Sequence, residues 1–217
     1  ANMRAAWNDA VAHQQWQLIA TSLGGYHYFH KRKGFYTQEI TLIDDAINAL
    51  EPVDKDAVLL GLNGRLCTMK AWNCLYLSQL ENGVQAATQA CALAQQAQNG
   101  TIEAQARLIW ARLLYRQSEH EQAMAQYEQV VSLAKAADDQ FLEADGLIGI
   151  GGQIVWQADV TPACEPLRRA LEICQNGRYK AGEMEALTWL GVFFMRQERF
   201  AESTRYYEQA LHLSRLL

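Results

Sequence analysis

Apolar residues recur every three or four positions along almost the whole chain, with polar residues between them. This spacing places the apolar side chains on one face of a helix, so it predicts α-helices nearly end to end. The breaks between these segments are short, and helices joined by such short loops pack as antiparallel hairpins. We expect helices at 2–12, 14–31, 37–50, 54–79, 84–98, 101–117, 119–137, 140–157, 161–174, 181–197 and 198–216, with a stop at Pro52 and a turn at Asn82-Gly83.

A second, longer period lies on top of the helical one. Five dipeptides recur at a step of about 44 residues and then at steps of about 40: Ala46-Ile47, Ala90-Cys91, Val130-Val131, Ala170-Leu171 and Ala210-Leu211. A fixed period in this range is typical of proteins built from stacked helix pairs. In the last unit Gly191 and Ser203 are the small residues, and we expect the two helices of the pair to approach each other there.

The pattern of large and small residues resembles the tetratricopeptide repeat (TPR). Leu187, Leu190-Gly191 and Phe194 match its first helix, and Phe200, Ser203, Tyr207 and Ala210 match its second. The resemblance implies an all-α fold: a right-handed superhelix, or α-solenoid, of about five TPR-like helix pairs with an extra N-terminal helix. It predicts one domain over 1–217, with a first helix at 1–13 and repeats at about 14–52, 53–98, 100–137, 140–176 and 179–217.

The repeat of about 40 residues is longer than the usual TPR unit of about 34. In this it resembles the arrays that follow the nucleotide-binding and winged-helix regions of bacterial signal-transduction ATPases, such as the maltose-regulon activator. The segments Asn2–Ala10 and Lys33–Tyr36 are similar to the junction where such proteins enter their arrays. The resemblance implies a piece of a larger bacterial, cytoplasmic regulator of transcription or signalling. No Walker motif occurs in the sequence, so any ATPase module would lie outside this chain.

The charge, hydropathy and cysteine content of the chain disfavour some classes of binding partner. The net charge is −5, which disfavours a general binder of nucleic-acid phosphates because such proteins need a basic face. The sequence has no run of about 18 apolar residues of the kind that spans a membrane. The five cysteines include no CxxC pair, and we interpret them as reduced core residues of a cytosolic protein.

Several residues invite a catalytic or metal-binding interpretation that the repeat register explains more simply. His27 and His30 lie one turn apart, but no third ligand is forced to join them, so helix packing accounts for both. The run Gly149–Gly152 lies mid-helix with no preceding strand, so we interpret it as a close helix contact, not a phosphate loop. The pair Asp44-Asp45 is interpreted as a solvated face. We therefore expect no enzyme activity, cofactor or metal site.

The candidate binding residues come from the first helix of each repeat, which lines the concave surface in such arrays. The exposed positions there are rich in Trp, Tyr and Arg, the residue types that dominate binding hot spots. Arginine also binds carboxylates with two parallel hydrogen bonds. The candidates are Tyr28, Arg32, Trp72, Tyr76, Arg112, Tyr115, Arg116, Trp156 and Arg196.

Two functional hypotheses follow. The first is a non-catalytic module that binds an acidic peptide segment or a partner domain, which could belong to its own parent chain. The second is a sensor domain that binds a small-molecule inducer, and its site would close over a few residues where a peptide groove would spread over three or more repeats. Against both stands the interpretation that Trp72 and Trp156 pack between repeats, with the arginines paired to neighbouring carboxylates.

Overall fold

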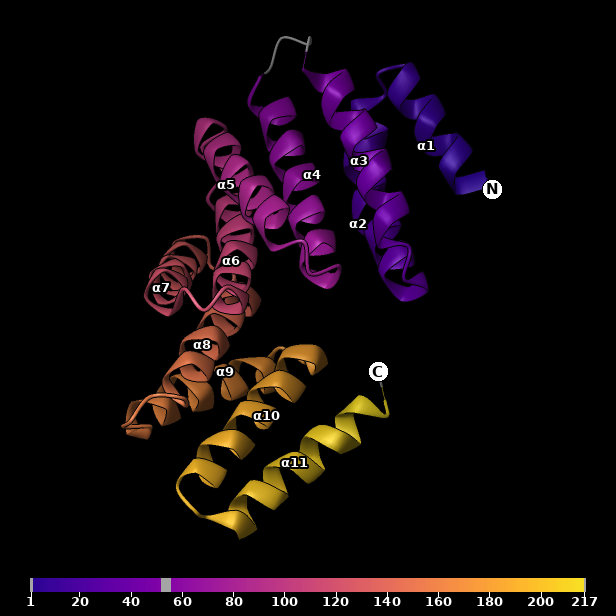
Figure 1. The fold of residues 1–217 in the computed structure, drawn as a ribbon. Coiled ribbons are helices and arrows are strands. Elements are labelled where there is room, and N and C mark those ends of the chain that lie inside the picture. Colours follow the sequence, from indigo (N-terminus) through magenta and orange to yellow (C-terminus); the bar gives the residue numbers. More distant parts are fainter. Residues whose placement is uncertain (1, 52–55, 217) are drawn as a thin grey trace. The chain divides into compact units, whose positions relative to one another are not determined.

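The computed structural model describes residues 2–51 and 56–216, and this part of the chain is helical with no strand (Figure 1). The predicted all-α fold is confirmed for these residues. Pro52 and Asp54, the predicted stop and start of two helices, lie outside the described residues, as do Ala1 and Leu217. The helices are α1 Asn2–Ala12, α2 Trp16–Lys33, α3 Tyr36–Leu50, α4 Ala57–Tyr76, α5 Leu80–Gln96, α6 Gly100–Arg116, α7 His120–Ala136, α8 Gln140–Ile154, the short 3-10 helix η1 Thr161–Ala163, α9 Cys164–Asn176, α10 Lys180–Arg196 and α11 Phe200–Ser214.

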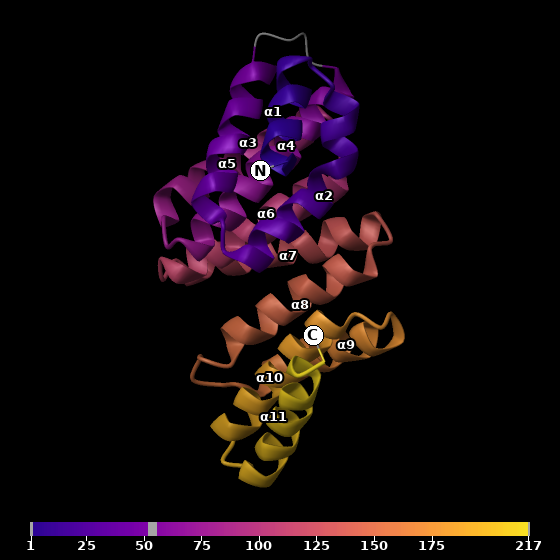
Figure 2. The ribbon, with the colours of Figure 1, turned by 90° about the vertical axis from the view of Figure 1, so that its right-hand side faces the viewer.

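The chain forms two compact units, unit 1 at residues 1–117 and unit 2 at residues 118–217. Unit 1 contains α1 to α6, and unit 2 contains α7 to α11. Within each unit a helix packs against helices no more than two places away in chain order. Figures 1 and 2 both show one such pair, α10 and α11, side by side. The single domain and the repeat boundaries predicted from the sequence stay a prediction.

Small residues sit where paired helices touch. In the last pair, the Ser203 hydroxyl donates a 2.8 Å hydrogen bond to the Gly191 carbonyl oxygen. A Cβ atom on Gly191 would lie 2.7 Å from Tyr207 Cε1, closer than two carbon atoms can pack. The run Gly149–Gly152 lies inside α8 and at its C-terminal end, as the packing interpretation requires. A Cβ atom on Gly149 would overlap the ring of Tyr127, which comes from α7.

The turn predicted at Asn82-Gly83 is wrong. Both residues lie inside α5, which begins at Leu80. The chain turns earlier, at Ser78, whose φ is 57°. Gly83 serves packing instead, because a Cβ atom there would lie 2.6 Å from Leu113 Cδ2 of α6. A dipeptide that signals a turn locally is thus used to bring two helices together.

Most helices end in the same way, with one residue in the left-handed region. After α5, the Gln98 amide donates to the Gln95 carbonyl oxygen and the Asn99 amide donates to the Ala94 carbonyl oxygen, which is the Schellman arrangement. The Asn99 side chain then accepts a 3.0 Å hydrogen bond from the Ile102 amide and caps α6. Left-handed residues other than glycine recur at a spacing of 20 residues, at Ser78, Gln98, Ser118 and Asp138 and again at Arg178 and Glu198.

We expect Gln98→Gly to raise the free energy of unfolding by about 0.5–1 kcal/mol. Gln98 is exposed, has a φ of 51° and bears the steric cost of a side chain in the left-handed region. The matched control is Gln89→Gly, at an exposed position inside α5, which should lower the free energy of unfolding by a similar amount. Urea unfolding of both variants tests the difference, and a loss of stability in both would contradict it.

Candidate functional site

A row of three stacked aromatic rings lies at the surface of unit 1. The Tyr36 and Tyr76 ring centroids lie 4.9 Å apart with an interplanar angle of 14°. The Trp72 and Tyr76 centroids lie 5.9 Å apart at 18°. We call Tyr36, Trp72 and Tyr76, with the two cations described next, the aromatic ladder.

Two cations lie over the rings of the aromatic ladder. Lys31 Nζ lies 5.7 Å from the Trp72 ring centroid and 5.6 Å from that of Tyr76. Arg112 Cζ lies 5.2 Å from the Trp72 centroid. These distances are within the range of favourable cation–π interaction, so the charges hold the rings in place and remain close to the surface.

Four helices position the aromatic ladder. Trp72 and Tyr76 are four residues apart on α4 and therefore share one helix face. Lys31 comes from the last turn of α2, and Gly34, with a φ of 70°, reverses the chain so that Tyr36 begins α3 beside it. Arg112 comes from α6. The ladder is thus fixed by backbone packing of the whole unit and not by a loop.

The aromatic ladder is accessible to a partner but is also anchored in the core. Tyr76 is 42% exposed, whereas Tyr36, Trp72 and Arg112 are half-buried. Trp72 packs against a buried cluster of α4, α5 and α6 that includes Ala87 and Leu113. The interpretation that Trp72 packs against neighbouring helices is therefore correct for part of its ring, and the exposed remainder continues the surface of Tyr76.

The surroundings of the aromatic ladder are basic. Lys31, Arg32 and Lys33 form the exposed end of α2, and Arg116 ends α6. In residues 2–51 and 56–216 no carboxylate is ion-paired to any of these four residues. Arg116 Nη2 instead lies 3.5 Å from Ser78 Oγ.

Two carboxylates of unit 1 pair with cations that are not part of the aromatic ladder. Asp44 pairs with Lys70 at 2.6 Å, and Glu103 pairs with Arg107 at 2.7 Å. The positive charge beside the aromatic ladder is therefore available to an incoming anion, although the whole chain has a net charge of −5.

The structure brings together three of the predicted residues, Trp72, Tyr76 and Arg112. Of the others in unit 1, Tyr28 is 64% exposed with no ring contact to the ladder in the described residues, Arg32 and Arg116 are exposed beside it, and Tyr115 is half-buried. Lys31 and Tyr36 belong to the ladder, although they were not among the candidates. Their signal was the turn at Gly34, which places the end of α2 and the start of α3 together.

Trp156 and Arg196 lie in unit 2. Trp156 is 54% exposed and follows the end of α8. Arg196 Nη2 donates a 3.3 Å hydrogen bond to the carbonyl oxygen of Gln157, the next residue after Trp156. These two candidates therefore lie at one end of unit 2. The binding role of all nine candidates stays a prediction.

The two histidines with metal-like spacing have structural partners. His27 Nδ1 lies 3.0 Å from Glu39 Oε1, and Asn73 Nδ2 donates a 3.0 Å hydrogen bond to Glu39 Oε2. His30 Nδ1 lies 3.0 Å from the Tyr26 carbonyl oxygen. Among the described residues no three His, Cys, Asp or Glu side chains gather in a way that could hold a metal ion.

The cysteines are free thiols, as predicted, and all except the half-buried Cys164 are buried. Burial raises the pKa of Cys91 to about 11 and that of Cys174 to about 12. It also raises the pKa of Cys74. These thiols stay protonated at neutral pH, and the thiolate is the nucleophilic form. None of these three is therefore suited to nucleophilic chemistry.

No described helix is both long enough and apolar enough to cross a lipid bilayer.

No protein-family model and no curated protein matches the sequence. Solved structures do match. BtubC (BKLC) from P. vanneervenii superposes with a TM-score of 0.77 at 14% identity, covering 98% of this chain and 90% of that chain. Two structures of a kinesin light chain-like protein from Podosopora anserina, with nearly identical TPR-like repeats, give TM-scores of 0.62 and 0.61 at 14% identity. They cover 89% of this chain and 93% and 94% of theirs.

These likenesses show the fold. The predicted class, an all-α array of TPR-like helix pairs, is confirmed by three structures of such repeats. At 14% identity they carry no information about ligands or partners. They do not bear on the resemblance to bacterial signal-transduction ATPases, which stays a prediction.

Proposed function

We propose that this chain is a non-catalytic protein-binding module whose aromatic ladder takes a peptide segment of a partner protein. The observation that carries the proposal is the exposed stack of Tyr36, Tyr76 and Trp72 with cations over its rings. Arrays of helix pairs present extended surfaces suited to this use. Aromatic side chains with few rotatable bonds give much contact area for little loss of conformational entropy.

The charge around the aromatic ladder indicates the chemistry of the segment. Lys31 lies over the rings, Arg32 follows it at the exposed end of α2 and Arg116 ends α6, and none of the three has a carboxylate partner in the described residues. An acidic segment gains ion pairs there, whereas a basic segment is repelled. The best match is a peptide with Asp or Glu next to an aromatic or aliphatic residue, so that the apolar side chain covers Tyr76 while the carboxylate reaches the cations.

The mechanism is binding to a surface that is already formed. The rings are stacked and held by Lys31 and Arg112 before a partner arrives, so little side-chain freedom is lost on binding. Binding energy is then available for affinity and for discrimination between partners. No chemical step on the partner is involved.

Unit 2 has a smaller patch of the same character at Trp156 and Arg196. It is a second surface on which a peptide side chain can pack against an aromatic ring beside an arginine. The partner in this proposal is a neighbouring domain of a larger bacterial regulator or a protein that controls it. The full-length reading frame tests that setting: a Walker motif and a winged helix upstream of Asn2 support it, and their absence removes it.

A selection from a random peptide library displayed on phage, with the full chain as bait, tests the binding function. We expect enrichment of segments that place Asp or Glu beside an aromatic residue. A selected peptide should bind Tyr76→Ala at least about tenfold more weakly, because truncation removes an exposed hot-spot ring. Fluorescence anisotropy of the labelled peptide measures the change.

The matched control is Phe200→Ala, which removes another exposed ring, 64% exposed, from unit 2. Its affinity for the peptide should remain that of the unaltered chain, and both variants should keep the helical circular dichroism of the parent. The proposal fails if the selection yields no acidic consensus or if the two variants bind the peptide equally well.

A further inference from the structure

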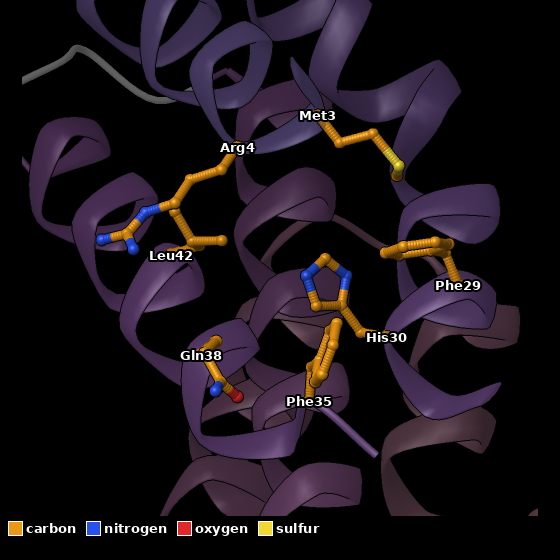
Figure 3. A pocket seen from close by; sticks show the side chains of 7 residues that line it. All are labelled: Met3, Arg4, Phe29, His30, Phe35, Gln38 and Leu42. Atoms are coloured by element: carbon orange, nitrogen blue, oxygen red, sulfur yellow. The ribbon is translucent and has the colours of Figure 1, made fainter. Parts of the chain in front are cut away.

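Unit 1 contains an open pocket of about 570 Å³ between α1, α2 and the start of α3 (Figure 3). Its volume is within the range of about 300–1,000 Å³ that small-molecule sites occupy. Trp7, which is 4% exposed, fixes α1 in place by donating a 3.1 Å hydrogen bond to the Leu42 carbonyl oxygen. Trp7 also stacks on Tyr26 with ring centroids 4.5 Å apart. The wall that α1 contributes is therefore held by the fold.

The apolar lining of this pocket is unusually exposed. Met3, Phe29 and Phe35 are 40%, 36% and 42% exposed, and the buried Leu42 lines the pocket across from Phe29, beside Arg4 (Figure 3). The rings of Phe29 and Phe35 lie 6.4 Å apart at 64°, edge to face. A ligand of low polarity would cover this surface, and each Å² of apolar area removed from water is favourable by roughly 25 cal/mol.

The polar lining gathers at the other side. Figure 3 shows Arg4 and Gln38 across the pocket from Phe29, with the His30 ring between them. No carboxylate lines the pocket, and in the described part of the chain Arg4 has no ion-pair partner. The pocket thus combines a mostly apolar lining with one cationic side chain, Arg4.

His30 adds a buried polar atom to the pocket. The side chain is 6% exposed, and its Nδ1 is within hydrogen-bond distance of the Tyr26 carbonyl oxygen, which can only accept. Nδ1 therefore carries the proton. Nε2 makes no hydrogen bond in the described residues, which leaves it available to a ligand.

We propose that this pocket binds a small amphipathic carboxylic acid. Its aromatic or aliphatic body lies against Phe29 and Phe35, and its carboxylate accepts hydrogen bonds from Arg4 and from the Gln38 amide. Charge complementarity selects this class, because a cationic ligand is repelled by Arg4, whereas a carboxylate gains a charge-assisted hydrogen bond from it that a purely apolar ligand lacks. The site is separate from the aromatic ladder and does not depend on the peptide-binding function.

Titration calorimetry on the full chain with 4-phenylbutyrate as the probe tests the proposal. We expect saturable binding of one molecule per chain, and binding of the uncharged 4-phenylbutanamide at least about tenfold weaker. Arg4→Gln should weaken 4-phenylbutyrate by about the same factor and leave the amide unchanged. Lys33→Gln removes the same charge at an exposed residue outside the pocket and should bind both probes as the parent does.

Two further variants distinguish binding in this pocket from binding at the aromatic ladder. Phe35→Ala should weaken both probes, because both use the apolar lining. Tyr76→Ala should bind 4-phenylbutyrate normally, so a failure of the aromatic ladder as a peptide site would leave this result intact. The proposal is overturned if no saturable binding is seen up to about 10 mM probe. It is also overturned if Arg4→Gln and Lys33→Gln behave alike in chains with the parent's melting temperature.

Discussion

Replacing Glu39 with alanine is expected to lower the free energy of unfolding by about 3–5 kcal/mol. The Glu39 side chain is 1% exposed and joins three helices of unit 1. It lies 3.0 Å from His27 Nδ1 of α2 and accepts a 3.0 Å hydrogen bond from the fully buried Asn73 of α4. Its removal leaves the fully buried Asn73 amide without its acceptor and takes away the partner of the half-buried His27.

Urea unfolding of the full chain measures this effect, with Asp45→Ala as the control. Asp45 lies on the same helix but is exposed, so its removal should change stability by no more than about 0.5 kcal/mol. Glu39→Gln should cost less than Glu39→Ala, because the amide keeps the volume and still accepts from Asn73. If Glu39→Ala and Asp45→Ala cost the same, the buried network does not stabilise the unit.

Gly149→Ala is expected to lower the free energy of unfolding by about 2 kcal/mol. The added methyl group would overlap the ring of Tyr127, which is 5% exposed and has no room to move away. Overpacking of this kind costs about 1–3 kcal/mol. The better helix propensity of alanine offsets part of the cost, by about 1 kcal/mol, so we place the clash at the upper end of the range.

The same substitution at Gly24 should have the opposite sign. Gly24 is exposed on α2, and no atom lies within 4 Å of the place that an added methyl group would take. Gly24→Ala therefore gains helix propensity of up to about 1 kcal/mol and meets no neighbour. A double-mutant cycle with Tyr127→Leu assigns the clash at Gly149 to its partner. The cost of Gly149→Ala should shrink when the ring is absent, and an unchanged cost would place the strain elsewhere.

Much of the fold can be predicted from the sequence because the residues that form the contact between paired helices recur in each repeat. Gly191 and Ser203 recur in register with small residues of other units, and the structure places them at a helix contact. The turn predicted at Asn82-Gly83 is wrong because a turn signal is a property of the dipeptide alone, whereas Gly83 contacts Leu113, which lies 30 residues further along the chain on the next helix. The residue types of a dipeptide alone do not show whether it forms a turn or packs against another helix.

The aromatic ladder could be predicted only in part, because some of its contacts join residues on different helices. Trp72 and Tyr76 are one turn apart on α4, so the helical period alone placed them on one face. Tyr36 depends on the left-handed turn at Gly34 and on how α3 then lies against α4, which no period describes. Glu39 is buried because His27 and Asn73 come from two other helices to meet it, and no pattern in the sequence links these three residues.

Because each helix packs only against helices close to it in chain order, the order in which the chain folds and unfolds is also constrained. A helix that contacts others at most two places away closes only short loops when it folds, so each pair can form early and with little loss of chain entropy. The last helix, α11, packs mainly against α10. Local unfolding of α11 therefore breaks one helix interface and leaves α7 to α10 folded. Because each helix adds the free energy of its own contacts with near neighbours, we expect α11 to unfold at a lower free energy than the helices inside unit 2.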